Sequence, residues 1–343
     1  MYFKSIQKLR GLAALSVFFY HVGVHLRVTG NNPDTLFRYI NDNFGMDGVT
    51  LFFVISGFVM SYLLNSDTNR FFLKRVLRIY PPFLVATFFV CLFYLLVKGH
   101  CPSTKLYLAL SLLPFGKQSY PLGVEWSLIY EIFFYVICSV LACNYLKRFF
   151  LYFLIAWLSA VYIAQHYYGA PTLFLPTVRD IFFSAYNIPF ILGGISFYIY
   201  KNAKKFVGRL DNKYLAAVFI GALALCTIHY MLVEFTLRIL FFGAGIGLIV
   251  IVGTLRDTSN VNTGGKTLLE KLGDRSYGIY LLHVPVIVFI YNSMKAHYGK
   301  ANEVSGFIAL ALALILGWYF GELDIFMHRA LKECLFGKRE KQV

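Results

Sequence analysis

The chain has 343 residues, of which 58% are apolar and only 14% are charged, and its formal net charge is +15. Because soluble domains are about half apolar and a quarter charged, this composition excludes a water-soluble domain and a disordered chain. The apolar runs are continuous and about 20 residues long, as membrane-spanning helices require, and they lack the alternation of a β-barrel. The positive charge is then the expected bias of cytoplasmic loops, and no nucleic-acid partner is expected.

The apolar runs predict ten membrane-spanning helices, so the fold class is an all-α integral membrane protein. We expect one membrane domain over 1–343, with a core at about 4–325, a short basic cytoplasmic tail at 326–343 and no fused soluble domain. A further stretch at 106–114 is too short to span and indicates a re-entrant or interfacial segment. The predicted spans are 9–26, 48–65, 83–98, 122–142, 149–168, 181–200 (interrupted by Pro189), 214–232, 236–253, 276–293 and 305–325.

The distribution of charge between alternate loops predicts the orientation. With the N-terminus in the cytoplasm, 23 of the 32 Lys and Arg residues fall in the inner segments, so both termini are expected to be cytoplasmic. The run 9–26 has no small-residue cleavage site after it and is expected to be the first span, not a leader. The six cysteines form no C-x-x-C pair, so neither a disulfide framework nor a metal site is expected.

The first span carries two ionisable residues on one helical face. Arg10 and His21 are 11 residues apart, which is three turns or about 16 Å along the axis. An ionisable residue near the middle of the bilayer is costly and indicates function. A phosphate-bearing ligand held by Arg10 could extend toward His21, whose imidazole could serve as a general base. The alternative is a structural histidine that is hydrogen-bonded to a neighbouring helix.

The basic stretch at 72–82, before the third span, places Arg75 and Arg78 three residues apart, on one face if this stretch is helical. Guanidinium groups suit phosphate recognition. The same charges would also serve as an ordinary cytoplasmic anchor, and charge alone favours that reading.

The fourth span places Ser127 and Glu131 on one face and Trp126 and Tyr130 on a neighbouring stripe. Glu125 is expected at the outer interface, whereas Glu131 is about 9 Å deeper and needs a partner. An aromatic stripe beside a carboxylate and a hydroxyl resembles a sugar-binding surface. An aromatic belt is the competing interpretation for Trp126.

The ninth span places Ser276, Tyr280 and His283 on one face, with His283 about 10 Å deeper than Ser276. Asp274 is expected to cap this helix.

Taken together, these motifs resemble the membrane-bound acyltransferase-3 family, which includes O-acetyltransferases of O-antigen, exopolysaccharide and Nod factors. The resemblance covers about residues 4–325. The matching segments are Leu9–Ala13 with His21, Gly48–Phe58, Arg75–Pro81, Trp126–Leu128 with Glu131 and Tyr135, and Ser276–Tyr277 with Tyr280–His283.

The resemblance implies a ten-helix core that moves an acyl group, usually acetyl, from cytoplasmic acyl-CoA to a carbohydrate hydroxyl. It implies His21 as the essential base and CoA phosphates held by Arg10, Arg75 and Arg78. We also expect Glu131, Tyr277 and His283 to be catalytic and Trp126, Ser127 and Tyr130 to bind the substrate. The expected partners are the lipid bilayer, acetyl-CoA or another acyl-CoA as co-substrate, and a glycan or lipid-linked carbohydrate. No metal is expected, and the expected location is the bacterial cytoplasmic (inner) membrane.

Several alternatives stay open. The segment Glu322-Leu323-Asp324 lacks the proline that many members have here, so no role for Glu322 is implied. Direct transfer and a covalent acyl relay both fit the motifs. A multi-pass exporter of a sugar or lipid-linked glycan would call for inverted repeats and buried carboxylates, and such repeats are not evident. A non-catalytic anchor gives no reason for Arg10 and His21 to share a face.

Overall fold

The computed structural model describes residues 2–31, 35–40, 43–66, 70–100, 105–142, 145–209, 211–259 and 265–337. Within these ranges the chain forms eleven α-helices, short 3₁₀ turns and a single isolated bridge between Phe115 and Thr177. The helices are α1 (Lys4–Val28), α2 (Asn43–Ser66), α3 (Phe71–Lys98), α4 (Leu106–Ser111), α5 (Glu125–Val140), α6 (Phe150–Tyr168), α7 (Ile188–Ala203), α8 (Asn212–Ile228), α9 (Phe235–Ser259), α10 (Leu268–Tyr298) and α11 (Glu303–Phe336).

The helix lengths confirm an all-α membrane architecture. In the described ranges, eight helices are long and apolar enough to cross a bilayer: α1, α2, α3, α6, α8, α9, α10 and α11. Helices α5 and α7 match two further predicted spans, but each has only 16 residues, fewer than the about 20 that a straight span needs. The number of ten spans and the cytoplasmic placement of the termini therefore stay predictions.

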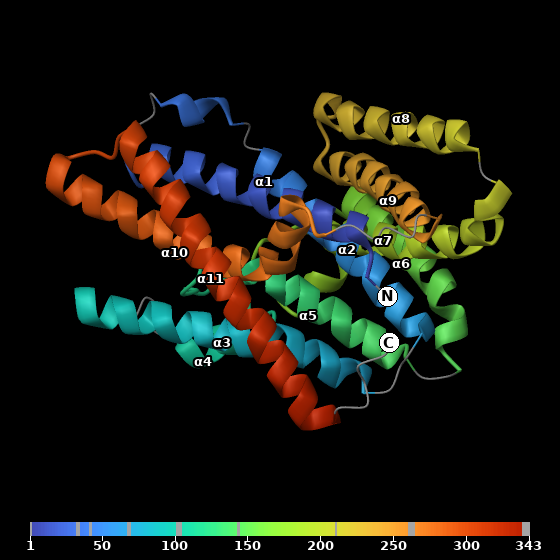
Figure 1. Ribbon diagram of the computed structural model, residues 1–343, viewed down its shortest axis with the longest axis horizontal. Helices are drawn as coiled ribbons and strands as arrows, with labels where there is room; N and C mark the ends of the chain where they lie inside the picture. Colours follow the sequence, from blue (N-terminus) through green and yellow to red (C-terminus); the bar gives the residue numbers. More distant parts are fainter. Residues whose placement is uncertain are drawn as a thin grey trace.

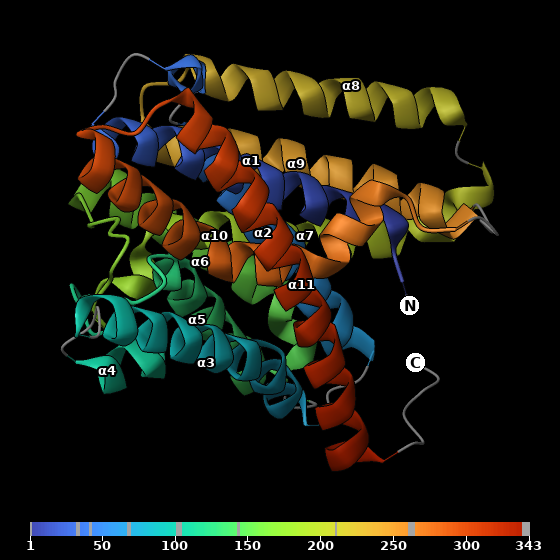
Figure 2. The same cartoon turned by 60° about the vertical axis from the view of Figure 1, so that its left-hand side comes forward.

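The long helices form one bundle, with α10 packed against α1 and α11, α2 against α1 and α7, and α9 against α7 and α8. In Figures 1 and 2, α8 and α9 lie on one side, α3 and α4 on the other, and α11 crosses the bundle diagonally to reach α3. Tyr2 and Lys332, near the two ends of the chain, line one cavity. We call this end of the bundle the terminal end and the opposite one the far end.

Helices α2 and α7 cross at a pair of glycines. A Cβ atom on Gly57 would overlap the carbonyl group of Phe190, and one on Gly193 would overlap the carbonyl group of Val54. The two backbones therefore touch directly, as small residues permit in membrane bundles.

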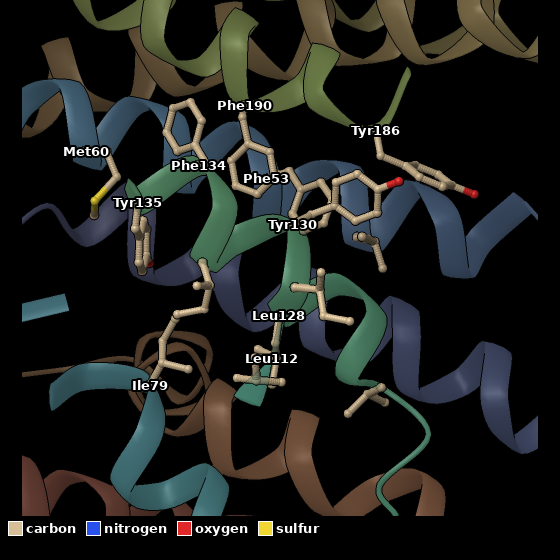
Figure 3. Packing of buried hydrophobic residues seen from close by; sticks show 14 of the residues in the cluster. Phe53, Met60, Ile79, Leu112, Leu128, Tyr130, Phe134, Tyr135, Tyr186 and Phe190 are labelled. Carbon is tan, nitrogen blue, oxygen red and sulfur yellow. The ribbon is translucent and has the colours of Figure 1, made fainter. Parts of the chain in front are cut away.

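Aromatic stacking beside this crossing holds the short helix α5 in place. The ring of Phe190 on α7 lies 4.1 Å from that of Phe53 on α2 and 4.8 Å from that of Phe134 on α5, measured between centroids. Figure 3 shows these three rings together, with Tyr135, the residue after Phe134 on α5, beside them. Such aromatic contacts add to the burial of the rings and fix the position of α5 relative to α2 and α7.

We expect Gly57→Ala to destabilise the fold strongly, because the added methyl group must push α2 and α7 apart and overpacking costs about 1–3 kcal/mol or more. The measurement is the melting temperature of the purified protein in detergent. Gly221→Ala on α8 is the matched control, since no atom lies within 4 Å of the position of its Cβ. Equal melting temperatures for the two variants would contradict the direct backbone contact.

Two predicted spans differ from the observed helices at their starts. Helix α3 begins at Phe71 and not at 83, because the basic stretch continues the helix beyond its apolar part. Residues 181–187 form two 3₁₀ turns, and α7 starts only at Ile188. Pro189 lies in the first turn of α7, where its missing N–H costs no hydrogen bond.

In the last part of the chain, the expectation that Asp274 caps a helix is wrong, and the last helix is longer than expected. Helix α10 starts at Leu268, where Thr267 caps it, so Asp274 lies inside the helix and binds Lys266 at 2.6 Å. Helix α11 continues to Phe336, well into the segment expected to be a tail. Hydropathy marks only the apolar stretch, while backbone hydrogen bonding carries a helix through the polar turns beyond it.

Candidate active site

A cavity of about 490 Å³, here called the terminal cavity, lies between α1, α2, α3, α5 and α10 and reaches the terminal end. Among the residues that the structure describes, five cationic side chains and one carboxylate line it. It brings together residues that lie far apart in the sequence and that the motifs singled out: Arg10, Arg75, Arg78, Ser127, Glu131 and Tyr277.

Two guanidinium groups face this cavity with no described carboxylate within ion-pair distance. Within the described ranges, the side chains of Arg10 and Arg75 make no hydrogen bond or ion pair, and Nε of Arg75 is a buried atom without a partner. Charge that is partly withdrawn from water and left unpaired is costly. The terminal cavity is therefore suited to an anion with several oxygen acceptors, such as a phosphate.

Arg78 differs from these two because it has an internal counter-ion. Its Nη1 lies 2.6 and 2.8 Å from the two carboxylate oxygens of Asp324, which is fully buried. Its guanidinium also lies over the ring of Tyr277, 5.4 Å from the centroid. The ion pair ties α3 to α11. Sequence reasoning missed Asp324, because it weighed that segment only for a missing proline.

Asp324→Asn is expected to lower the free energy of unfolding by about 3–5 kcal/mol, because it leaves the Arg78 guanidinium partly buried and unpaired. Denaturation of the purified protein in mixed micelles measures this change. The control is Glu322→Gln, whose partner is Arg275 and whose side chain is 47% exposed. An exposed pair contributes about 0–1 kcal/mol, so equal losses in both variants would contradict a special role for the buried pair.

Glu131, which was expected deep in a span, is hydrogen-bonded by two hydroxyl groups. It accepts hydrogen bonds from Ser56 Oγ at 3.1 Å and from the Tyr135 hydroxyl at 2.5 Å, both to Oε1. No described cation lies within ion-pair distance of it. The two hydroxyl groups orient the carboxylate at the cavity wall. Its charge attracts Arg10 and Arg75 without an ion pair to either, so the N–H groups of both guanidinium groups are available to a ligand.

A pair of hydroxyl groups lies deeper in the terminal cavity. Ser127 Oγ is 2.6 Å from the Tyr280 hydroxyl and 3.1 Å from the carbonyl of Val124. Because a carbonyl only accepts, Ser127 donates to Val124 and Tyr280 donates to Ser127. The hydroxyl group of Tyr277 donates to the Ile79 carbonyl at 3.0 Å. These three hydroxyl hydrogens are all engaged in this structure.

The two predicted histidines form a pair just beyond this point. His283 lies one turn from Tyr280 on α10, and His283 Nε2 is 3.2 Å from His21 Nδ1 on α1. Neither histidine lines the terminal cavity, since Tyr280 stands between, with its ring centroid 5.7 Å from that of His283. The pairing joins two motifs that are 262 residues apart.

The hydrogen bonds of the pair determine which nitrogen of His21 is free. Nδ1 of His21 lies 2.8 Å from the Val17 carbonyl, and Nδ1 of His283 lies 2.8 Å from the Tyr280 carbonyl. Because both carbonyls are acceptors, both Nδ1 atoms carry hydrogen, and a neutral His283 accepts from His21 through Nε2. Nε2 of a neutral His21 then has a free lone pair, and within the described ranges it makes no hydrogen bond.

The aromatic stripe of α5 does not face the terminal cavity. Tyr130 is fully buried, and its hydroxyl donates to the Leu173 carbonyl at 2.7 Å and lies 2.8 Å from Ser184 Oγ. The Trp126 ring packs 6.3 Å from that of Phe53. This structure thus provides no direct contact between either residue and a ligand in the terminal cavity.

Glu125 is not at a solvated interface, so that expectation is wrong. Its side chain is fully buried and accepts hydrogen bonds from the backbone N–H groups of Leu122 at 2.7 Å and Val124 at 2.9 Å. A carboxylate at the start of α5 also interacts favourably with the helix dipole. Acidic residues favour the first turn of a helix, which is the sequence signal for this role.

The fold and the site define a multi-pass membrane protein with a cavity lined by cationic side chains and a histidine pair next to Tyr280, one of the residues that line it. A family model described as an acyltransferase domain matches residues 3–322, so the chain belongs to the acyltransferase-3 family and is an acyltransferase. The "Putative acetyltransferase ORF330" of Acidianus two-tailed virus is 28% identical over 298 residues, which cover 81% of this chain and 82% of that protein. No solved structure matches the chain. The family resemblance seen in the sequence is confirmed.

Proposed function

We propose that this protein transfers an acyl group, in the simplest case acetyl, from cytoplasmic acyl-CoA to a hydroxyl group of a cell-surface carbohydrate in the bacterial inner membrane. The observation that carries the proposal is the pair of unpartnered guanidinium groups, Arg10 and Arg75, in a cavity that leads toward His21 and His283.

The terminal cavity suits the shape and charge of acyl-CoA. The phosphates of acyl-CoA would bind Arg10 and Arg75, whereas the charge of Arg78 is already balanced by Asp324. Arg10 and His21 lie on the same helix, 11 residues and about 16 Å apart. A narrow pantetheine arm can extend over such a distance and bring a thioester to the inner end of the cavity, near Ser127 and Tyr280.

His21 would act as the base through Nε2. It takes the proton from the acceptor hydroxyl as that oxygen attacks the thioester carbonyl, the C–S bond then breaks, and the proton passes to the leaving sulfur. The Val17 carbonyl and His283 Nε2 both accept from His21 Nδ1, so they stabilise the imidazolium that forms. Holding both substrates in one place would contribute as much as the proton transfer.

The test uses purified protein in lipid nanodiscs and acetyl-CoA labelled in the acetyl group. We expect label to be released slowly as acetate without an acceptor, and to pass to surface polysaccharide when membranes of expressing cells supply it. Succinyl-CoA and a long-chain acyl-CoA, tested in parallel, define the acyl group. A folded protein that neither binds nor turns over any acyl-CoA would contradict the proposal and favour a glycan exporter.

A further inference from the structure

A second cavity, here called the far cavity, lies at the opposite end of the bundle from Arg10, Arg75 and Arg78. It has a volume of about 340 Å³ and is lined by the first turns of α2 and α9, the segment between α6 and α7, and the turn after α8. None of the motifs described above supplies its charged residues, which are Asp47, His229 and Arg238.

Asp47 and His229 form a buried polar centre in this cavity. His229 is 2% exposed, and its Nε2 lies 3.3 Å from Asp47 Oδ1 without making a hydrogen bond. Its Nδ1 donates to the carbonyl of Cys226. The Tyr230 hydroxyl donates to the other carboxylate oxygen of Asp47 at 2.7 Å. The carboxylate is thus held in a fixed orientation, and His229 Nε2 has unused hydrogen-bonding capacity.

Arg238 adds a group of opposite charge to the same cavity, where it attracts Asp47 from beyond ion-pair distance. Across the described residues its side chain makes no hydrogen bond or ion pair. A guanidinium and a carboxylate on one wall can together hold neighbouring hydroxyl groups, since the first donates hydrogen bonds and the second accepts them. A free anion would suit Arg238 but would be repelled by Asp47.

The remaining wall of the far cavity is aromatic. The rings of Phe174 and Tyr186 stack 5.5 Å apart, and that of Phe235 lies 5.6 Å from Tyr186. Figure 3 shows Tyr186 beside Tyr130, at the edge of the buried aromatic cluster. Flat apolar surfaces beside a few placed polar groups are the usual composition of a site for an amphipathic small ligand. A pyranose ring has this character, because its C–H faces are apolar and its rim carries hydroxyl groups.

The partition between the two cavities is thin. On α2, Val49 lines the terminal cavity and the next residue, Thr50, lines the far cavity. The Trp126 ring lies between Phe53 of the terminal cavity, at 6.3 Å, and Tyr186 of the far cavity, at 5.2 Å. A ligand in the far cavity would therefore be close to the inner end of the terminal cavity.

The geometry points to the far cavity as the binding site for a sugar ring of the carbohydrate acceptor, an inference that rests on the proposed function. Asp47 and Arg238 hold its hydroxyl groups, His229 adds a further polar contact, and Phe174 and Tyr186 pack against its apolar face. This makes Trp126 a neighbour of the acceptor site and not its platform.

The test separates the acceptor from the donor by two readouts on each variant. One is transfer of label from acetyl-CoA to surface polysaccharide in membranes of expressing cells, and the other is release of acetate from acetyl-CoA by the purified protein. We expect Asp47→Asn and Arg238→Gln to lower transfer at least about tenfold, the size of one lost charge-assisted hydrogen bond, and to leave acetate release unchanged. The matched control is Arg179→Gln, an exposed arginine that lines neither cavity.

Each outcome of this test either supports or overturns the inference that the far cavity binds the acceptor. Transfer at the wild-type rate in both variants overturns the inference, and so does an equal fall of transfer and acetate release in folded Arg238→Gln protein. If Asp47→Asn does not fold, the result for Arg238→Gln is sufficient by itself. This variant should fold, because the Arg238 side chain makes no hydrogen bond or ion pair within the described ranges. A wild-type protein that performs neither reaction contradicts the proposed function itself, which is a different failure.

Discussion

His21→Ala is expected to lower the rate of acyl transfer by about 10²–10⁴-fold, the usual contribution of a general base. The affinity for acyl-CoA should stay close to that of the wild type, because His21 does not line the terminal cavity. The measurements are single-turnover transfer of labelled acetyl and, separately, acetyl-CoA binding by equilibrium dialysis.

His25→Ala is the matched control for this prediction. The His25 ring stacks on that of His21 with 5.7 Å between centroids, but it binds Thr29 and makes no hydrogen bond to His21. We expect nearly full activity for His25→Ala and an intermediate loss for His283→Ala, which removes one of the two acceptors for His21 Nδ1 and leaves the Val17 carbonyl. Full activity of a correctly folded His21→Ala protein would eliminate His21 as the base.

Arg10→Gln and Arg75→Gln are each expected to weaken acetyl-CoA binding by about 10–100-fold, because each removes one or more charge-assisted hydrogen bonds to phosphate. The fall should appear in KM more than in kcat, since the phosphates are distant from the reacting carbonyl. Isothermal titration with acetyl-CoA and with CoA measures the binding loss directly.

Two comparisons make this prediction specific to phosphate. Arg70→Gln, at an exposed residue next to α3 that lies outside the cavity lining, should bind acetyl-CoA as the wild type does. Acetyl-pantetheine carries the thioester without the phosphates, so Arg10→Gln should process it as well as the wild type. An equal loss with acetyl-CoA and acetyl-pantetheine would mean that Arg10 supports the fold and not the phosphates.

Much of the architecture could be predicted from hydropathy alone, because spans of about 20 apolar residues have few other uses. The sequence located the stretches that became α1, α2, α6, α8 and α9, and it singled out the short stretch that contains α4. The polar turns of α3, α10 and α11 lie beyond the apolar signal and were missed. The two helices near the centre, α5 and α7, are shorter than a span and are held by the stack around Phe190.

The candidate site was predictable where its residues share a helix and not where they meet across helices. Helical spacing gives the common face of Arg10 and His21. It gives no sign that Asp324 neutralises Arg78, because that pair depends on how α11 crosses α3. The far cavity escaped attention for the same reason, since Asp47, His229 and Arg238 belong to no local pattern and meet only when α2, α8 and α9 pack together.

Consecutive residues of α2, Val49 and Thr50, line cavities at opposite ends of the bundle. If the donor binds in the terminal cavity and the acceptor in the far cavity, neither substrate has to leave before the other arrives, because the chain can hold both at once. Steady-state rates should then give intersecting double-reciprocal lines, as a ternary complex does, whereas a covalent acyl relay would give parallel lines. Because α2 separates the two cavities, steady-state kinetics can distinguish direct transfer from a covalent relay.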